Sequence, residues 1–82
     1  MIEEEFQIST QEEKDASGNL VKWTEETRDG DTLIRKRVDE YTYYDTGEVN
    51  TITQKVFDGE GNLVSEKRVK HFRDGRPPEV EG

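Results

Sequence analysis

Turn signals that contain glycine recur along this chain at short intervals, and they restrict it to a fold with many tight connections. They are DASG at 15–18, DG at 29–30, DTG at 45–47, DGEG at 58–61 and DG at 74–75. The intervening segments, such as TLIRKRVDEYTYY, are rich in β-branched and aromatic residues, which favour strands. No segment has apolar residues at a sustained helical spacing. The sequence therefore predicts an all-β fold, an antiparallel meander of about five long strands with room for a short sixth.

The size and composition of the chain allow only a thin core. The 82 residues predict one β domain over residues 1–76, followed by a C-terminal tail at 77–82. Hydrophobic residues make up 28% of the chain and charged residues 39%, with a net charge of −8, which is also the signature of disorder. The regular recurrence of β-branched and aromatic residues between turns favours a folded chain.

Three of the turns also predict how the strands pair. Asp29-Gly30 as a type I′ turn, a glycine-closed turn after Tyr44 and the DGEG turn each fix a register. The predicted pairs are Trp23 with Lys36, Val21 with Val38, Glu12 with Lys22, Tyr44 with Glu48, Lys36 with Val56, Asp58 with Asn62 and Val56 with Val64. These registers predict one apolar face made of Val21, Trp23, Ile34, Val38, Ile52, Val56, Val64 and Phe72, with Trp23 fully buried. The second face is also partly apolar, so we expect either a twisted sheet that curls into a small open barrel or a sheet that packs on another subunit.

One heptapeptide occurs twice, as DASGNLV at 15–21 and as DGEGNLV at 58–64. The match extends upstream, so the chain is interpreted as two copies of one hairpin unit. The acidic residues are compatible with a calcium loop, but Leu63 occupies the position where such a loop requires glycine. In a turn, by contrast, the aspartate caps the loop and the glycine takes a positive φ. The heptapeptide is therefore predicted to be a turn.

The segments FDGEGNL and YYDTGEV resemble the hairpin units of YD-type repeats and of MORN-variant repeats. The resemblance covers residues 41–75. It departs from these families at Lys14, where an aromatic residue is expected, and it lacks their Gly-Trp repeat start. The resemblance implies a scaffold of stacked hairpins used for interactions, not for catalysis.

Residues with catalytic or binding chemistry are sparse. His71 has no identifiable partner, no cysteine is present, and every glycine lies in a turn signal or at the C-terminus. We therefore predict no enzyme, no cofactor and no metal. Residues 1–31 hold ten acidic and three basic side chains, which argues against nucleic-acid binding. No secretory signal or transmembrane helix is predicted, no membrane partner is expected, and the location, whether virion or cytoplasm, stays open.

The aromatic residues Tyr41, Tyr43, Tyr44, Phe57 and Phe72 are candidates for an interaction surface. For the three tyrosines, burial of the end of their own hairpin is the favoured interpretation, because apolar residues are scarce in this chain. We expect a non-enzymatic structural or assembly protein that forms a homo-oligomer or joins a larger protein complex, such as a virion or surface layer. The alternative is a small acidic inhibitor that mimics nucleic acid and blocks a basic cleft. A designed β scaffold is a third interpretation.

Overall fold

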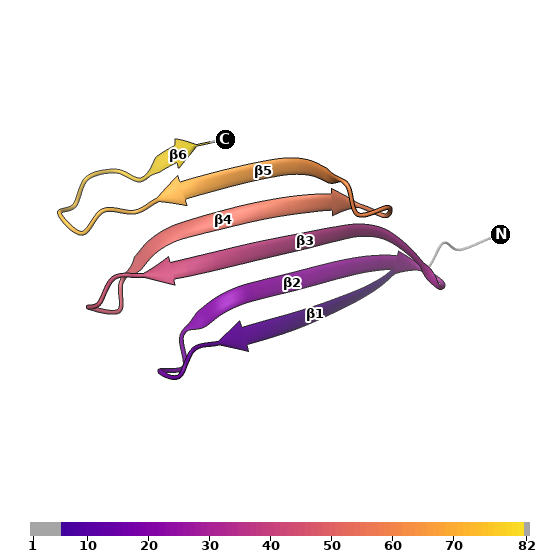
Figure 1. Ribbon diagram of the computed structural model, residues 1–82, viewed down its shortest axis with the longest axis horizontal. Helices are drawn as coiled ribbons and strands as arrows, with labels where there is room; N and C mark the ends of the chain where they lie inside the picture. Colours follow the sequence, from indigo (N-terminus) through magenta and orange to yellow (C-terminus); the bar gives the residue numbers. More distant parts are fainter. Residues whose placement is uncertain (1–5, 82) are drawn as a thin grey trace.

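The computed structural model describes residues 6–81, which form a single six-stranded antiparallel sheet (Figure 1). The strands are β1 (Phe6–Lys14), β2 (Leu20–Asp29), β3 (Thr32–Tyr43), β4 (Val49–Asp58), β5 (Leu63–Lys70) and β6 (Glu79–Glu81). Each strand pairs with the next one along the chain, so the sheet has the order β1-β2-β3-β4-β5-β6. The predicted all-β meander is confirmed. The sheet is open and is not closed into a barrel.

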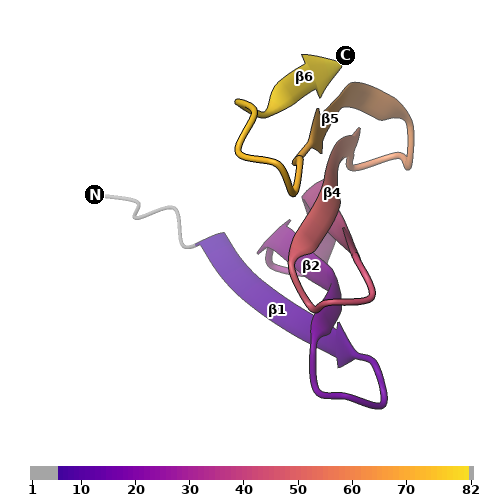
Figure 2. The same cartoon turned by 90° about the vertical axis from the view of Figure 1, so that its left-hand side faces the viewer.

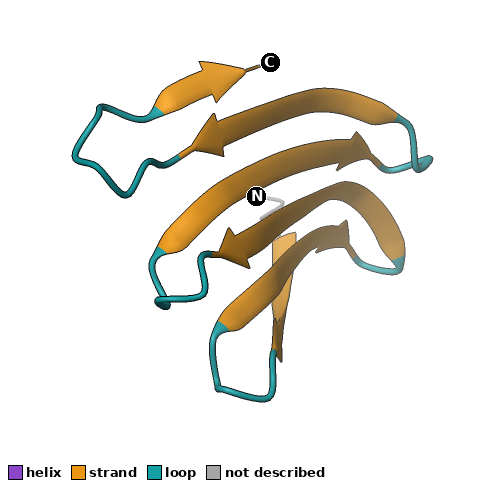
Figure 3. Cartoon of the chain, turned by 60° about the vertical axis from the view of Figure 1, so that its left-hand side comes forward, coloured by secondary structure: helices purple, strands orange, loops and turns teal. Residues whose placement is uncertain are grey.

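The short strand β6 lies in the segment assigned to the tail and pairs with Arg68–Lys70 of β5. The described residues contain no helix, and so no helical segment that could cross a membrane. The sheet is strongly twisted, with β1 crossing the direction of β6 when it is viewed from the end (Figure 2). The turns alternate between its two ends (Figure 3).

Three of the connecting turns share one backbone design. In each turn, the residue at the end of the first strand donates its N–H to the carbonyl of the residue four positions later. The glycine three positions after that first residue donates its own N–H to the first residue's carbonyl. These pairs are Asp15 with Asn19 and Gly18, Tyr44 with Glu48 and Gly47, and Asp58 with Asn62 and Gly61. The three glycines have φ values of 87°, 92° and 89°, which residues with a side chain rarely adopt. The predicted turns at Tyr44 and Asp58 are confirmed.

The β2–β3 turn differs from its prediction. Its two central residues are Gly30 and Asp31, because Asp29 pairs with Thr32. Gly30 has a φ of 60°, whereas no non-glycine residue of the described chain has a positive φ. A positive φ at the first central residue alone defines a type II′ turn. The predicted type I′ turn at Asp29-Gly30 is therefore wrong.

Each of the four long hairpins also contains a β-bulge shortly after its turn, which the turn-based registers omit. The extra residue lies on the second strand of the hairpin, at Val21, Ile34, Asn50 and Val64. A bulge increases the local twist and moves the pairing beyond it by one residue. Four bulges in one small sheet are consistent with its strong twist.

The bulges and the displaced turn correct the predicted pairs. Trp23 pairs with Asp39, not Lys36, a shift of three residues. Lys36 pairs with Phe57 instead of Val56. The remaining corrected pairs are Thr24 with Val38, Glu12 with Trp23, Glu13 with Lys22 and Val56 with Ser65. Side chains alternate between the two faces of a sheet, so a register shift by an odd number of residues moves a residue to the other face. Val38 therefore lies on the face of the sheet that does not carry Trp23.

The sheet is a single layer and buries very little. Within residues 6–81, Val38 is the only buried hydrophobic residue, at 6% exposure, and Asp39 and Thr51 are the buried polar ones. The radius of gyration is 15.8 Å, whereas a compact chain of this length has a value of about 12 Å. One face of this layer must therefore be considered as a contact surface.

Candidate functional site: one apolar face of the sheet

The observed registers sort the side chains into two faces, because directly paired residues point the same way. Residues adjoining the turns are left aside. What we name the Trp23 face consists of Phe6, Ile8, Thr10, Glu12, Trp23, Glu25, Thr27, Arg35, Arg37, Asp39, Tyr41, Ile52, Gln54, Val56, Ser65, Lys67, Val69 and Val80. The opposite face consists of Gln7, Ser9, Gln11, Glu13, Lys22, Thr24, Glu26, Lys36, Val38, Glu40, Thr42, Thr51, Thr53, Lys55, Phe57, Glu66, Arg68, Lys70, Glu79 and Glu81.

The two faces differ in polarity. Eight of the 18 residues on the Trp23 face are aliphatic or aromatic, against two of the 20 on the opposite face. The opposite face is instead lined by Thr, Gln, Ser and charged residues of both signs, and its ion pairs include Lys55–Glu40 at 3.2 Å. An antiparallel sheet with one wet face and one apolar face normally packs the apolar face on something else. Here no other part of the described chain covers it.

Apolar side chains are most exposed at the two edges of the Trp23 face. Phe6 and Ile8 on β1 are 51% and 64% exposed, and Val80 on β6 is 61% exposed. Towards the centre, Trp23, Ile52 and Val56 are half-buried. The predicted full burial of Trp23 is therefore wrong, because a one-layer sheet has nothing to place above it. The prediction that Trp23, Ile52 and Val56 share a face is confirmed.

A charged cluster lies at the centre of this apolar face. Arg37 donates to both carboxylate oxygens of Asp39, from Nε to Oδ1 at 3.1 Å and from Nη2 to Oδ2 at 3.0 Å. With its amide oriented to satisfy both side chains, Gln54 accepts from Arg37 Nη2 at 3.0 Å and Nε at 2.8 Å. The guanidinium also lies 5.3 Å from the centre of the Trp23 ring, within the range of a cation–π contact.

Within this cluster, the positive charge of Arg37 is balanced by the negative charge of Asp39. The hydrogen bonds to Asp39 raise the pKa of Arg37 above its usual value. Burial raises the pKa of the nearby Tyr41 phenol, and the negative charge of Asp39 adds to that effect. No buried side-chain nitrogen or oxygen of the described residues lacks a hydrogen-bond partner. Both groups of the Arg37–Asp39 ion pair are therefore satisfied within the sheet.

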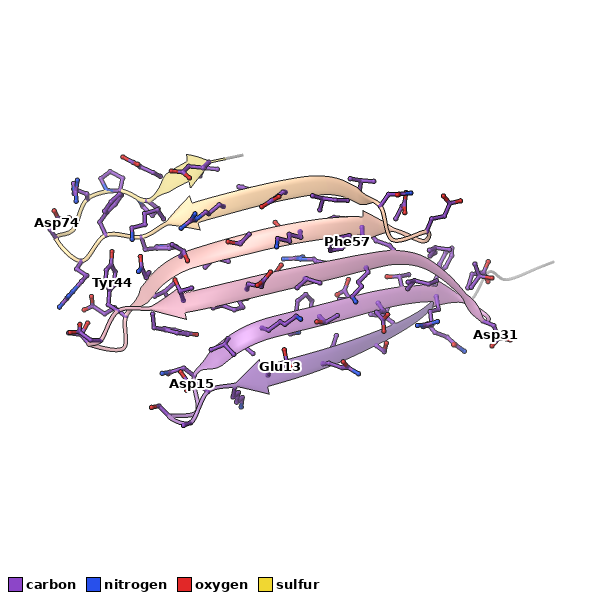
Figure 4. All side chains as sticks on the ribbon, viewed as in Figure 1. Glu13, Asp15, Asp31, Tyr44, Phe57 and Asp74 are labelled. Carbon is purple, nitrogen blue, oxygen red and sulfur yellow. The ribbon has the colours of Figure 1, made fainter. Side chains whose placement is uncertain are left out.

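The five predicted surface residues are all half-buried, and the structure brings the three tyrosines together but not the two phenylalanines. Tyr41, Tyr43 and Tyr44 line one hollow between the β1–β2 and β3–β4 turns, and the Tyr43 hydroxyl donates to the Leu20 carbonyl at 2.6 Å. Tyr44 and Phe57 lie at opposite ends of the sheet (Figure 4).

Tyr44 also contacts the segment around the β5–β6 loop, where Phe72 lies. The Tyr44 hydroxyl donates to the His71 carbonyl at 2.7 Å. Its ring lies 5.2 Å from Lys70 Nζ and 5.1 Å from the Arg73 guanidinium, and Arg76 covers Phe72 at 4.2 Å. The tyrosine hydroxyls thus hold loops in place.

Phe57 lies on the opposite face, in a small hollow with Leu33 and Lys36. The Trp23 face itself was missed as a site, although a sequence signal for it exists. Three of the four bulges end a pair of adjacent apolar residues, Leu20-Val21, Leu33-Ile34 and Leu63-Val64. Such pairs interrupt the alternation of a strand just after a turn, where bulges occur.

Groups that could hold a metal do not gather anywhere in residues 6–81, where no set of three or more His, Cys, Asp or Glu side chains is suitably placed. Both backbone groups of His71 are hydrogen-bonded: its N–H donates to the Asn50 carbonyl at 2.7 Å, and its carbonyl accepts from the Tyr44 hydroxyl.

Comparison of the chain with known families, curated proteins and solved structures finds no match. The fold and the face thus define a class only, a single-layer β meander with one uncovered apolar face.

Proposed function

We propose that this protein is a non-enzymatic structural or assembly protein that completes its core by packing the Trp23 face against another protein surface. The observation that carries the proposal is the asymmetry of the single layer: its apolar residues gather on one face, and no second layer covers them. One buried aliphatic side chain contributes only about 1.5–3 kcal/mol. A small domain needs more than this to fold alone.

The alternative of an acidic mimic of nucleic acid receives less support from the geometry. The carboxylates of β1 and β2 are divided between the faces, with Glu12 and Glu25 on the Trp23 face and Glu13 and Glu26 on the opposite one. A mimic needs a continuous row of negative charge that matches a phosphate backbone. On the opposite face the acidic residues alternate instead with Lys22, Lys36 and Lys55.

The test compares two substitutions that add the same charge to neighbouring positions of β1. Ile8→Glu places a carboxylate on the Trp23 face, and Ser9→Glu places one on the opposite face; both positions are exposed. We expect light scattering of the wild type to show a mass above 9.5 kDa that falls on dilution. Ile8→Glu should lower this association by about tenfold or more, and Ser9→Glu should leave it nearly unchanged.

The stability of the monomer provides the opposing outcome. If wild type stays at 9.5 kDa at every concentration and still unfolds cooperatively at the temperatures of ordinary domains, about 45–65 °C, a single layer suffices without a partner. That result would contradict the proposal. A monomer that is unfolded alone would support packing on a different protein.

A further inference from the structure

The charges on the Trp23 face form a directional pattern. Direct pairing places Glu12, Trp23, Asp39, Gln54 and Lys67 in one row across five strands. The row starts with an acid on β1 and ends with a base on β5, and Arg37 neutralises Asp39 in the middle. Neighbouring strands are about 4.8 Å apart, so Glu12 and Lys67 are roughly 19 Å apart within one sheet and cannot pair there.

We propose, building on the function proposed above, that the partner is a second copy of this chain, stacked Trp23 face on Trp23 face about a two-fold axis parallel to the strands. Such an axis, placed over β3, reverses the order of the strands, so β1 and β2 of one copy lie over β5 and β4 of the other. The row is then turned end for end. Glu12 lies close to Lys67 of the other copy, and the symmetry creates this contact twice.

The rest of the face fits this arrangement. Away from the turns, the exposed base Arg35 on β3 and the half-buried acid Glu25 on β2 keep the same division, with acid on β1–β2 and base on β3–β5. Beside the turns, Lys14 and Asp58 depart from it. The chain carries a net charge of −8, yet the Trp23 face is close to neutral. Away from the turns it holds three acidic and three basic residues, namely Glu12, Glu25, Asp39, Arg35, Arg37 and Lys67, and beside the turns pairing adds Asp29, Asp58 and Lys14. A balanced face can meet its own copy without the repulsion that the whole chain would produce.

The size of the face is also adequate. A nine-residue strand is about 30 Å long and five strands span about 19 Å, which gives a footprint of roughly 600 Å² before side-chain relief is counted. Stable interfaces bury around 800 Å² on each partner. Two stacked sheets would lie about 10 Å apart, and the aromatic and aliphatic residues of each would fill the space between them.

The edge of β1 is the competing surface, because all nine of its residues are exposed. Parallel, in-register pairing of two β1 strands edge to edge would place Glu12 beside Glu12 and Glu13 beside Glu13. Like charges on an edge strand are a common guard against this pairing. The stacked arrangement makes no such contact.

Cross-linking tests the arrangement directly, since the chain contains no cysteine. Glu12→Cys mixed with Lys67→Cys should give a covalent dimer with a short bismaleimide, whereas each variant alone should not. Glu13→Cys mixed with Arg68→Cys is the matched control, with adjacent positions on the same two strands that point to the opposite face. Circular dichroism checks that every variant keeps its β signal.

Charge reversal gives a second readout that does not depend on chemical reactivity. Glu12→Lys alone and Lys67→Glu alone should each weaken dimerisation by about tenfold. An equimolar mixture of the two should restore it to within about threefold of wild type, because each copy then meets an opposite charge.

The outcomes separate the two proposals. Dimers that cross-link through the Glu13 and Arg68 control, or through Glu12→Cys with itself, would overturn the stacking and leave the assembly function standing. A chain that is unfolded by itself would overturn the second copy as partner. A stable wild-type monomer would overturn both.

Discussion

The turns at Asp15–Val21 and Asp58–Val64 are built alike but are used differently. In both, the aspartate Oδ1 accepts two backbone N–H groups at 2.9 Å, from Ser17 and Asn19 in the first and from Glu60 and Asn62 in the second. The glycine φ values differ by only 2°. The same letters therefore give the same loop, whatever surrounds it.

The difference lies in the second position, Ala16 in one turn and Gly59 in the other. A Cβ on Gly59 would clash with the Leu33 carbonyl oxygen, so this loop packs tightly against the start of β3. Ala16 already carries a Cβ and is exposed. The residues shared by the two copies thus determine the loop conformation. The position that varies, Ala16 or Gly59, differs because only the second loop packs against another strand.

The third turn of this design shows which part of the motif the backbone needs. Tyr44 takes the place of the capping aspartate, yet the hydrogen bonds to Glu48 and Gly47 form at 2.8 and 3.0 Å. Gly47 keeps its positive φ of 92°. The glycine is therefore required for the shape of the loop, and the carboxylate adds to its stability.

The largest loss of stability is expected from substitution at the position that differs between the two turns, Ala16 in one and Gly59 in the other. Gly59→Ala should destabilise the protein by about 2 kcal/mol, because the new methyl group meets backbone that cannot rotate away. Ala16→Gly, the reciprocal change, should cost no more than about 0.5–1 kcal/mol through the entropy of the unfolded chain. Urea unfolding of both variants measures the difference. Equal losses would show that Gly59 is not packed against β3.

A smaller effect is expected at the position that both turns share. Gly61→Val and Gly18→Val should each cost about 1–2 kcal/mol, because a β-branched residue is strained at positive φ. No atom lies within 4 Å of a Cβ at either site, so strain alone is measured. Melting temperatures of the two variants should fall by similar amounts. A loss confined to one of them would contradict the equivalence of the turns.

Features of the fold that depend on residues close in sequence could be predicted, whereas features that depend on contacts between strands could not. The turn loops and the strands between them depend on residues a few positions apart, and Tyr44 opposite Glu48 was predicted correctly. The bulge at Asn50 ends no pair of adjacent apolar residues, so neither its turn nor its local sequence indicates it. Because the bulge at Ile34 shifts the register by one residue beyond the misplaced β2–β3 turn, the predicted apolar face wrongly included Val38.

The capping carboxylates give a still smaller, pH-dependent effect. Hydrogen bonds from the Asn19 and Asn62 N–H groups hold the pKa values of Asp15 and Asp58 below the ordinary 3.8. A lowered folded-state pKa stabilises the fold above pH 3.8, and this contribution is lost as the pH falls through the lowered values. Asp15→Asn and Asp58→Asn should therefore be slightly less stable than wild type at pH 7.

At low pH the difference should vanish, because the wild-type carboxylates are then neutral as well. Urea unfolding at pH 7 and at stepwise lower pH follows this difference, and the effect should be similar in the two turns. Asp45→Asn is the control, since that carboxylate lies in the third turn and faces Arg73 at 3.4 Å. A variant gap that persists unchanged at low pH would show that the carboxylate charge is not what stabilises the loop.

Adding calcium is expected to have no effect on the melting temperature. In both turns Oδ1 is occupied by two N–H groups, and Oδ2 lies 3.5 and 3.3 Å from the Asn19 and Asn62 side-chain amides. A cation needs several oxygens that converge on it, whereas this loop directs amide hydrogens at its carboxylate. Millimolar calcium should leave the melting temperature where magnesium or a chelator leaves it. A rise specific to calcium that Asp58→Asn removes, and that Asp45→Asn does not, would make the repeated heptapeptide a binding loop.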